Sequence, residues 1–545
     1  MVGTFISTAS VIFVKILGML YVIPFYHIVG SKGGALYSYA YNVYLIFLGI
    51  SSAGIPSAIS KIISEYNALG YLEAKTRVFS LGKKIIGFIS IIMFILLFVF
   101  AEEFATLIIG DLTGGNTIAD VCFVIRCVSF AVLIIPHLSV TKGYFQGHKY
   151  FTPSSVSNLI EQVVRIFVIL AGSFLAYKVF NSSLTLAVGI AVSGAFFGGL
   201  VAYLYLKRNM NKYKSDLNLD KEYQKDNVTN KEIVKKIAKY AIPFIIINIV
   251  NNIYSFTDMV LVLRTLNKLG FSASDVEFIT SVISTWSGKI AMVVNSIAMG
   301  MTVTLIPTIV ESFTKKDHQS LNHNLNKALQ IVTYTSLPLA IGISILATPI
   351  WTIFYNTNAY GGAILKVIIF NALIGNISMI VSATLQSCNR FKAVYLTNII
   401  GLLTNALLDV PLMLLCHRIG IGAYYGAIIS STIGFIISIT LGLKLVGNNE
   451  FSLNYKDTFI WIGKSLVPAS FMVIVLLPLN KILPFNVYQK GGALLTIIIN
   501  AIIGGIIFIY ISYKLGILDH IFGIDAINKL LKKLTRGKFQ LKGKK

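Results

Sequence analysis

The sequence predicts an all-α integral membrane protein of about 14 transmembrane helices, in which two six-helix lobes form a parallel repeat and two C-terminal helices follow. Three observations favour this class. Hydrophobic residues make up 55% of the 545 positions and charged residues only 12%, compared with roughly 25% charge in soluble domains. Apolar runs that could supply the roughly 20 residues of a spanning helix recur along the whole chain. The chain also repeats itself once.

The repeat is clearest in the stretch that begins at Gln146, which recurs 240 positions later without a gap. Phe151 and Asn158 of this stretch meet Phe391 and Asn398. A second set of matches has an offset of 246, which a six-residue difference in one loop would explain: Gly54, Ile63 and Glu65 meet Gly300, Ile309 and Glu311. This period is too long for a solenoid and suits a duplicated membrane bundle.

Fourteen apolar segments are candidate spans. They cover residues 3–28, 35–60, 85–109, 119–140, 154–177, 184–206, 240–263, 283–311, 328–354, 361–386, 394–416, 422–446, 459–479 and 491–514. Each repeat holds six, and an even number of crossings gives both repeats the same orientation in the membrane. The predicted parts are an N-terminal lobe (1–206), a cytoplasmic linker (207–239), a C-terminal lobe (240–447), helices 13 and 14 (448–514) and a basic cytoplasmic tail (515–545).

The net charge of +24 has two explanations, and the distribution of the charge decides between them. A nucleic-acid partner would require a folded basic face. Here most of the 46 lysines and arginines lie in the connections that become cytoplasmic if the N-terminus is inside, as the positive-inside rule requires. We therefore expect a multi-pass membrane protein with both termini in the cytoplasm and no nucleic-acid partner.

Two polar segments flank the predicted bundle. The linker has almost no apolar periodicity before Ile233 and is expected to be a tether that is mobile at least in part. The tail from Asp519 has apolar residues at helical spacing opposite lysines and Arg536. A basic amphipathic helix on an anionic leaflet would explain this pattern, and a solvated positive-inside tail would explain it equally well.

Ionisable side chains inside the spans are the first candidates for a functional site. They are Lys15, Arg126, Glu161, Arg165, Asp258, Lys289 and Asp409. Each would oppose insertion by roughly 2.5–3.5 kcal/mol at a helix centre, so they are expected to line a cavity or to pair. Glu161 and Arg165 have the i, i+4 spacing of an intrahelical ion pair. Binding of an anionic headgroup is the competing role for both.

The excess of cations inside the spans indicates an anionic ligand. We assign Lys15, Arg126, Glu161, Arg165 and Lys289 to a candidate substrate-binding site. A positive cavity suits a phosphate-bearing substrate, although lysine acts there as a point charge without the bidentate fit of arginine. Plain ion pairing is the alternative.

A second pattern indicates a cation site. Asn248, Asn251, Ser255 and Asp258 share one face of the seventh span by their spacing, as do Asn398, Asn405 and Asp409 on the eleventh. Asp258, Asn405 and Asp409 would suit a small hard cation such as Na⁺. Proton binding, or a salt bridge from Asp258 to Lys289, competes, and interhelical hydrogen bonds would account for the amides.

Motifs for catalysis or for a bound cofactor are missing from the sequence. The seven histidines are scattered, the four cysteines lie in apolar segments without metal-ligand spacing, and there is no Walker A sequence. We expect a non-enzyme without a cofactor, driven by an ion gradient, the membrane potential or the substrate gradient, with Na⁺ or H⁺ as the possible coupling ion.

Several stretches resemble one family. They are G-T-F-I-S-T-A-S-V-I-F-V-K-I-L-G-M-L-Y-V-I-P-F near the N-terminus, G-G-A-L-Y-S-Y-A-Y-N-V-Y, G-Y-F-Q-G-H, E-Q-V-V-R-I and L-I-P-T-I-V-E-S-F. The chain is similar to the polysaccharide-transport branch of the MOP flippase superfamily, especially to the YtgP and stage V sporulation protein B group, which is related to the MurJ lipid II flippases. The resemblance covers nearly the whole chain.

The resemblance implies a bacterial plasma-membrane transporter with a cationic cavity, alternating access and a groove for an isoprenoid tail at helices 13 and 14. By position, Lys15 and Lys289 fall where the family has basic cavity residues. Asp258, Asn405 and Asp409 match residues that bind Na⁺ in some MurJ proteins. The chain departs from the family at Tyr21-Val22, where better-studied MurJ proteins have an Arg-Asp pair, so its headgroup recognition is expected to differ.

We therefore expect a flippase that moves an undecaprenyl-pyrophosphate-linked precursor from the inner to the outer leaflet, with lipid II as the first candidate. Its partners would be the lipid-linked glycan, the bilayer and proteins of cell-wall synthesis. The alternatives are a flippase for another lipid-linked oligosaccharide and a MATE-like cation or drug antiporter, which would need an acidic cavity. A membrane transferase fits less well because the sequence has no catalytic cluster and no large catalytic loop. A non-transporting scaffold fits less well because it would not need a buried polar cavity.

Overall fold

The computed structural model describes residues 10, 13–217, 227–447, 453–523 and 528. These residues are mostly helical and contain no strand, which confirms the predicted all-α membrane class. They pack as two compact units, Met1–Lys289 and Ile290–Lys545.

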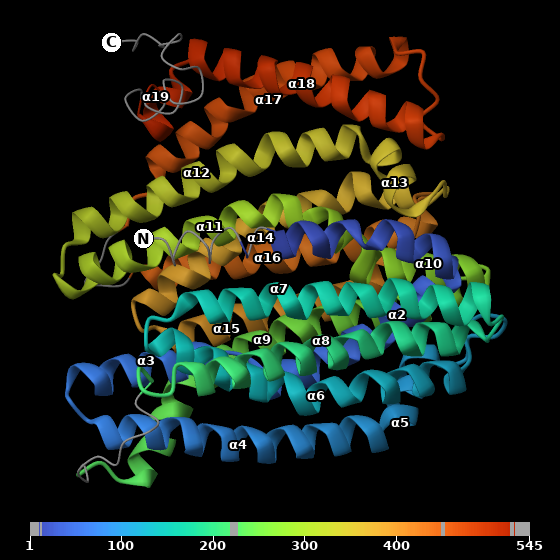
Figure 1. Ribbon diagram of the computed structural model, residues 1–545. Helices are drawn as coiled ribbons and strands as arrows, with labels where there is room; N and C mark the ends of the chain where they lie inside the picture. Colours follow the sequence, from blue (N-terminus) through green and yellow to red (C-terminus); the bar gives the residue numbers. More distant parts are fainter. Residues whose placement is uncertain (1–9, 11–12, 218–226, 448–452, 524–527, 529–545) are drawn as a thin grey trace. The chain divides into compact units, whose positions relative to one another are not determined.

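The first unit contains helices from both sides of the predicted linker (Figure 1). After the helical residues 13–20 they are α2 (Val22–Ser52), α3 (Ile55–Ala68), α4 (Leu72–Val99), α5 (Ala101–Ile109), α6 (Ile118–Gly147), α7 (Phe151–Phe167), the π-helical turns η1 (Val168–Gly172) and η2 (Leu175–Val179), α8 (Leu184–Lys212), α9 (Asn230–Lys268), α10 (Ala273–Ser281), η3 (Val282–Trp286) and the start of α11 (Ser287–Thr314).

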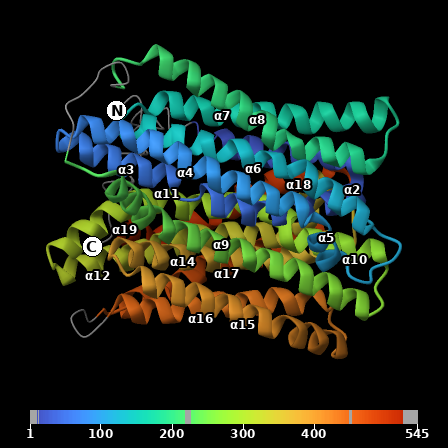
Figure 2. The ribbon, with the colours of Figure 1, turned by 90° about the horizontal axis from the view of Figure 1, so that it is seen from below.

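The second unit contains the rest of α11 and the remaining helices. They are α12 (His318–Ile345), α13 (Ala347–Tyr355), α14 (Gly361–Ser387), α15 (Phe391–Arg418), α16 (Tyr424–Val446), α17 (Lys456–Ile482), α18 (Lys490–Lys514) and α19 (Ile517–Phe522). Figure 2 shows α15 beside α16, which pack closely along their length.

Twelve helical segments of the described residues are long and apolar enough to cross a membrane. The difference from fourteen has two sources. Phe13–Ala68 counts as one segment, although Gly30 interrupts it with a positive φ of 65°, a conformation that glycine adopts readily. The other source is α9, a 39-residue helix that covers the predicted seventh span but is not among the twelve.

The sequence repeat is also visible in the structure, because equivalent helices begin or end at equivalent positions. An offset of 246 relates the bounds of α4 to those of α12 and the bounds of α5 to those of α13, and an offset of 240 relates the starts of α7 and α8 to those of α15 and α16. The turn before α7 also recurs, because Lys149 and Asn389 both have positive φ, 64° and 57°. One break does not recur: Gly54 separates α2 from α3, whereas Gly300 lies inside the continuous α11.

The core of the first unit includes residues from the predicted linker. Ile233 and Ile237 of α9 and Leu217 after α8 are buried among apolar side chains of α3, α4 and α6. Tyr144 Oη donates to the Leu217 carbonyl at 2.9 Å. By contacts, α9 therefore belongs with the first unit, whereas the sequence repeat assigns it to the second half.

Two sequence predictions fall largely outside the described residues. The middle of the linker is not described, although both of its flanks continue as the helices α8 and α9. The predicted amphipathic tail helix is described only up to Gly523 and at Asn528. Within that part, Ile517 and Ile521 of α19 are buried against the helices of the second unit's core.

Candidate functional site

The candidate site is built on α7, which has a polar face on an otherwise apolar helix. Ser154, Ser155 and Gln162 are buried, whereas Val163 and Phe167 are 50% and 68% exposed. A spanning helix with this division can turn its apolar side to lipid and its polar side to neighbouring helices.

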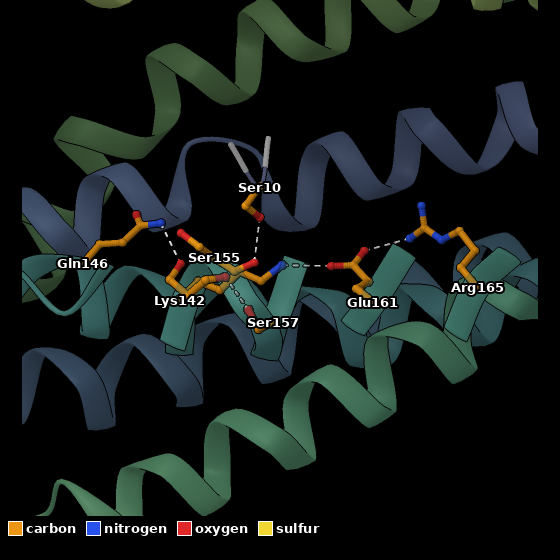
Figure 3. Close-up of polar contacts among 8 residues, drawn as sticks. Ser10, Lys142, Gln146, Ser155, Ser157, Glu161 and Arg165 are labelled. Carbon is orange, nitrogen blue, oxygen red and sulfur yellow. Dashed lines mark hydrogen bonds and ion pairs between the residues drawn. The ribbon is translucent and has the colours of Figure 1, made fainter. Parts of the chain in front are cut away.

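Neighbouring segments form hydrogen bonds with the first polar residues of this face. Ser10 Oγ donates to the Ser155 carbonyl and Gln146 Nε2 of α6 donates to Ser154 Oγ, each at 2.9 Å (Figure 3). The first polar residues of α7 are thereby connected to α6 and to the segment before α2.

Glu161 lies further along the same face and accepts two charge-assisted hydrogen bonds. Lys142 Nζ of α6 is 2.8 Å from its Oε2, and Arg165 Nη2, one turn further along α7, is 2.8 Å from its Oε1. Figure 3 shows the carboxylate between the two cations. Their side chains are only 13%, 17% and 23% exposed for Lys142, Glu161 and Arg165, so water screens the attraction only in part. The predicted i, i+4 pair is present, and a second cation joins it.

Two glycines of α8 allow this part of α7 to pack closely. A Cβ at Gly194 would lie 2.9 Å from the Arg165 carbonyl oxygen, and one at Gly198 would lie 2.5 Å from the Glu161 carbonyl oxygen. Any larger residue at either position would collide with the α7 backbone. The small residues of α8 therefore help to fix the position of the ion pair.

Two aromatic rings lie next to Lys289, another cation of the predicted substrate site. Lys289 Nζ lies 5.4 Å from the ring centre of Tyr41 and 5.8 Å from that of Tyr21, within the range of cation–π attraction. Tyr37 stacks on Tyr41 at 5.6 Å and on Trp286 at 5.8 Å. Aromatic faces attract an ammonium group but supply no counter-charge.

π-helical turns lie next to both cations. η1 begins three residues after Arg165, and η3 ends three residues before Lys289. In η3, Thr285 accepts a hydrogen bond from Asn42 Nδ2 of α2 at 2.9 Å. Such wide turns are frequent at functional sites, and here η3 connects the start of α11 to α2.

The tyrosines of α2 bring the two regions together. The Arg165 guanidinium interacts electrostatically with the hydroxyls of Tyr44, Tyr41 and Tyr37, and Tyr41 also faces Lys289. The structure thus unites three predicted residues, Glu161, Arg165 and Lys289, in one polar band of the first unit.

The other two residues of the predicted substrate site have different surroundings. Arg126 Nε of α6 donates to the Phe98 carbonyl at 3.3 Å, near the C-terminal end of α4, and its guanidinium lies over the Phe98 ring. Lys15 is half-buried in the helical residues 13–20. Nothing in these contacts joins Arg126 to the band among the described residues, so its predicted role in binding stays a prediction.

The second unit contains the predicted polar residues of α15. Asn405 and Asp409 are fully buried, and both accept from Ser430 Oγ of α16, at 3.0 Å in the case of Asn405. Ser430 Oγ also lies 2.8 Å from the Ala427 carbonyl oxygen. The single hydroxyl proton of Ser430 can satisfy only one of these three acceptors at a time, and Asn405 Oδ1 also accepts from Ser431 Oγ at 3.1 Å. This set of hard oxygen atoms fits a small cation or an added proton.

The polar stripe of α9 belongs to the first unit. Asn248 and Asn251 are exposed, and Asp258 is buried with 7% of its surface exposed. Asn252, which the stripe did not include, donates to the Leu45 carbonyl of α2 at 2.9 Å. The participation of Asp258 in a cation site stays a prediction.

Sequence reasoning missed Lys142, the tyrosines of α2 and Ser430. The predicted fourth span ended at residue 140, so Lys142 was counted with the cytoplasmic connection, whereas α6 continues to Gly147. The spacing of Tyr37, Tyr41 and Tyr44, at four and three residues, was a usable signal for one face of a helix.

Comparison with known proteins decides the family. The family model described as "Polysaccharide biosynthesis protein" matches residues 1–313, more than half of the chain. Lipid II flippase MurJ of Bacillus subtilis (strain 168) is 32% identical over 532 residues, 96% of each protein. The chain belongs to the MOP flippase superfamily, in the branch related to MurJ.

Other comparisons agree with the assignment of this chain to the MurJ-related flippases. Stage V sporulation protein B of the same organism is 23% identical over 477 residues, 87% of each chain. The solved structure of lipid II flippase MurJ in an inward closed conformation has a TM-score of 0.66 at 18% identity and covers 92% of this chain and 98% of its own.

A more distant likeness extends to the MATE transporters. The MatE family model matches residues 243–410. An inward-facing multidrug resistance MATE transporter has a TM-score of 0.62 at 13% identity, covering 79% of this flippase and 94% of its own chain. At these identities the structural likenesses show the fold, which is that of a multi-pass membrane transporter.

Proposed function

We propose that this MurJ-related flippase moves an undecaprenyl-diphosphate-linked cell-wall precursor from the inner to the outer leaflet by alternating access, with lipid II as the first candidate. The identity to lipid II flippase MurJ over 96% of both proteins supports the substrate class. The charge of the polar band carries the proposal, because Lys142, Arg165 and Lys289 outnumber the carboxylate of Glu161.

The three cations would bind the diphosphate in different ways. Arg165 can present two parallel N–H donors to one phosphate, whereas Lys142 and Lys289 act as point charges. Lys15, half-buried on the first helix, is the fourth candidate contact. The isoprenoid tail would remain in lipid, where every buried methylene favours the membrane by about 0.8 kcal/mol.

Genetic rescue tests the proposal. The resident lipid II flippase is depleted in a bacterium that dies without it, this chain is expressed at a confirmed membrane level, and lipid II in the outer leaflet is assayed. We expect growth together with restored outer-leaflet lipid II. Arg165→Ala and Lys289→Ala, at equal membrane levels, are expected to lower the transported amount at least tenfold.

Good expression without rescue would overturn lipid II as the substrate. The next candidate is another undecaprenyl-linked oligosaccharide, which two features favour: the relationship to stage V sporulation protein B, and Tyr21-Val22 in place of a charged pair. A MATE-like exporter of cationic drugs is disfavoured because the polar band of the first unit is basic.

Coupling to a cation is a separate part of the proposal. Asn405, Asp409 and Ser430 would hold Na⁺ through oxygen atoms only, which is the ligand type that hard cations prefer. A proton on Asp409 is the alternative. Either ligand would change the balance of conformations only by its difference in affinity for them.

The location follows from the same proposal. We infer that the protein lies in the bacterial plasma membrane with both termini in the cytoplasm, because this orientation leaves most lysines and arginines inside. Proteins of cell-wall synthesis would then supply the substrate on one side and consume it on the other. The related proteins are transporters, and we treat this chain as a transporter without catalytic activity.

A further inference from the structure

The ion triad formed by Lys142, Glu161 and Arg165 suggests how the site exchanges its anion. Both oxygens of the Glu161 carboxylate are used, one by each cation, at 2.8 Å. The two cations come from different helices, α6 and α7, and Figure 3 shows the carboxylate bridging them. Glu161 therefore occupies the place where an external anion would contact both cations at once.

Arg165 has donor capacity that Glu161 does not use. A guanidinium has five N–H donors and no acceptor, and a single donor, on Nη2, reaches the carboxylate. Arg165 Nε is buried, and no acceptor for it lies among the described residues. An unsatisfied buried donor destabilises a structure by about 1–3 kcal/mol, so this atom favours a conformation in which it meets an acceptor.

Tyr44 supplies a second buried donor near Arg165. Its hydroxyl likewise has no partner among the described residues, its side chain is 2% exposed, and it interacts electrostatically with Arg165. Two buried donors of this region thus lack an acceptor among the described residues, and a ligand rich in acceptor oxygens would supply one. Neither atom is open to solvent in this conformation, so the ligand must displace Arg165 from Glu161 to reach them.

A phosphate group meets these requirements better than a carboxylate does. It offers three acceptor oxygens and more negative charge, and arginine recognises it with two parallel donors. We propose that Glu161 is an exchangeable internal counter-ion, which a substrate phosphate replaces between Lys142 and Arg165 and which takes the two cations back when the substrate leaves. This inference rests on the proposed function and adds Glu161 to it as the residue that sets affinity and release.

The exchange explains why a transporter would keep a carboxylate in a site for anions. Without Glu161, two half-buried cations would attract any small anion and would hold the substrate too tightly for release. With it, binding must break two existing ion pairs, which lowers affinity and speeds dissociation. Removing the carboxylate should therefore tighten binding and slow turnover, whereas removing either cation should weaken binding.

Binding of two defined lipids to the purified full chain in lipid nanodiscs tests the proposal. The probes are undecaprenyl diphosphate and undecaprenol, which share the tail and differ in the phosphates. We expect Glu161→Gln to bind the diphosphate about tenfold more tightly, a change of the size of one charge-assisted hydrogen bond. Lys142→Gln should bind it at least fivefold more weakly, and the affinity for undecaprenol should stay unchanged in both variants.

Glu65→Gln is the matched control. It breaks another carboxylate–lysine pair of the first unit, in which Lys236 Nζ lies 2.6 Å from Glu65 Oε1, and it should leave both affinities unchanged. Melting temperatures establish that each variant is folded. If Glu161→Gln does not fold, Glu161→Asp serves instead, because its shorter side chain cannot bridge both cations and should tighten binding severalfold.

The outcomes separate the inference from the function on which it rests. Equal or weaker diphosphate binding by a folded Glu161 variant would overturn the exchange and make Glu161 a structural counter-ion only. Wild-type protein that does not distinguish the diphosphate from undecaprenol would instead overturn the proposed substrate class. Tighter binding by Glu161→Gln together with slower transport in the rescue strain would support the exchange.

Discussion

At the scale of single residues, the carboxylates of Glu161 and Asp409 have different surroundings. Glu161 is neutralised by two cations, Lys142 and Arg165. Asp409 is fully buried and contacts the hydroxyl of Ser430. An ionised carboxylate in such a place needs a compensating charge. The first carboxylate is thus already paired with two cations, whereas the binding of a cation at the second stays a prediction.

Substitution of Asp409 tests the cation site. We expect Na⁺, added against choline at constant ionic strength, to raise the free energy of unfolding by about 2–3 kcal/mol at one hundred times its dissociation constant. Asp409→Asn should abolish the rise, because the amide removes the charge and keeps the shape. The measurement is the melting temperature of the purified chain.

Asp457→Asn is the control for that experiment, since Asp457 is an exposed residue at the start of α17. An equal Na⁺ effect in the Asp409 variant would refute the site. Stabilisation that follows pH and is indifferent to Na⁺ would assign the site to a proton.

At the scale of elements, the repeated turn before α7 and α15 offers a matched pair of substitutions. Lys149 and Asn389 have the same left-handed backbone, with φ of 64° and 57°. This conformation costs an ordinary residue about 1–2 kcal/mol, and asparagine tolerates it better. The two halves of the chain thus use different residues for one geometry.

We therefore expect Lys149→Asn to stabilise the protein by about 0.5–1 kcal/mol and Asn389→Lys to destabilise it by a similar amount. Thermal unfolding in detergent measures both. Changes of the same sign in the two variants would contradict the backbone explanation.

The packing of α19 against the core helices of the second unit is expected to depend on pH. Its His520 ring stacks on Trp461 at 3.7 Å, and burial together with Lys327 lowers the pKa of His520 from its usual 6.5. Between the lowered pKa and the usual one, His520 therefore binds more protons when α19 is detached than when it is packed. The contribution of His520 to docking is present above about pH 6.5 and is lost as the pH falls through the lowered pKa.

Hydrogen exchange checks this expectation. After correction for the intrinsic rate, amides of α19 should exchange faster at about pH 5.5 than at about pH 7.5. In His520→Asn the difference should disappear, because the asparagine side chain does not titrate in this range. A pH effect that persists in the variant would assign it to another group.

At the scale of the whole molecule, the repeat predicts which positions share a side of the membrane. Thr152 and Lys392 are equivalent and exposed at the starts of α7 and α15, and Thr113 and Ala359 are equivalent and exposed in the loops after α5 and α13. Parallel repeats place each pair on one side.

Cysteine labelling in whole cells measures this arrangement. The four native cysteines are replaced, and single cysteines are introduced at the four positions. We expect a membrane-impermeant maleimide to label Thr113→Cys and Ala359→Cys and to leave Thr152→Cys and Lys392→Cys unlabelled until the cells are opened. Different labelling within a pair would refute the parallel repeat, and reversal of both pairs would refute the cytoplasmic termini.

The sequence by itself determined the membrane class, the approximate positions of most helices and the repeat, and it offered the pairing of Glu161 with Arg165 as one of two roles. These features follow from local rules, because apolar length specifies a span and the helical period places residues i and i+4 on one face. The same rules found Asn405 and Asp409 on one face of α15.

Only the tertiary structure decided which helices share a unit and which side chains meet across them. Lys142 reaches Glu161 from α6, Lys289 meets Tyr41 of α2, and Ser430 of α16 meets Asp409. Such contacts depend on how closely helices approach and at what angle they cross, which small residues such as Gly198 of α8 control. Spacing along one helix carries no information about its neighbours, so this part of the site could be seen only in the folded chain.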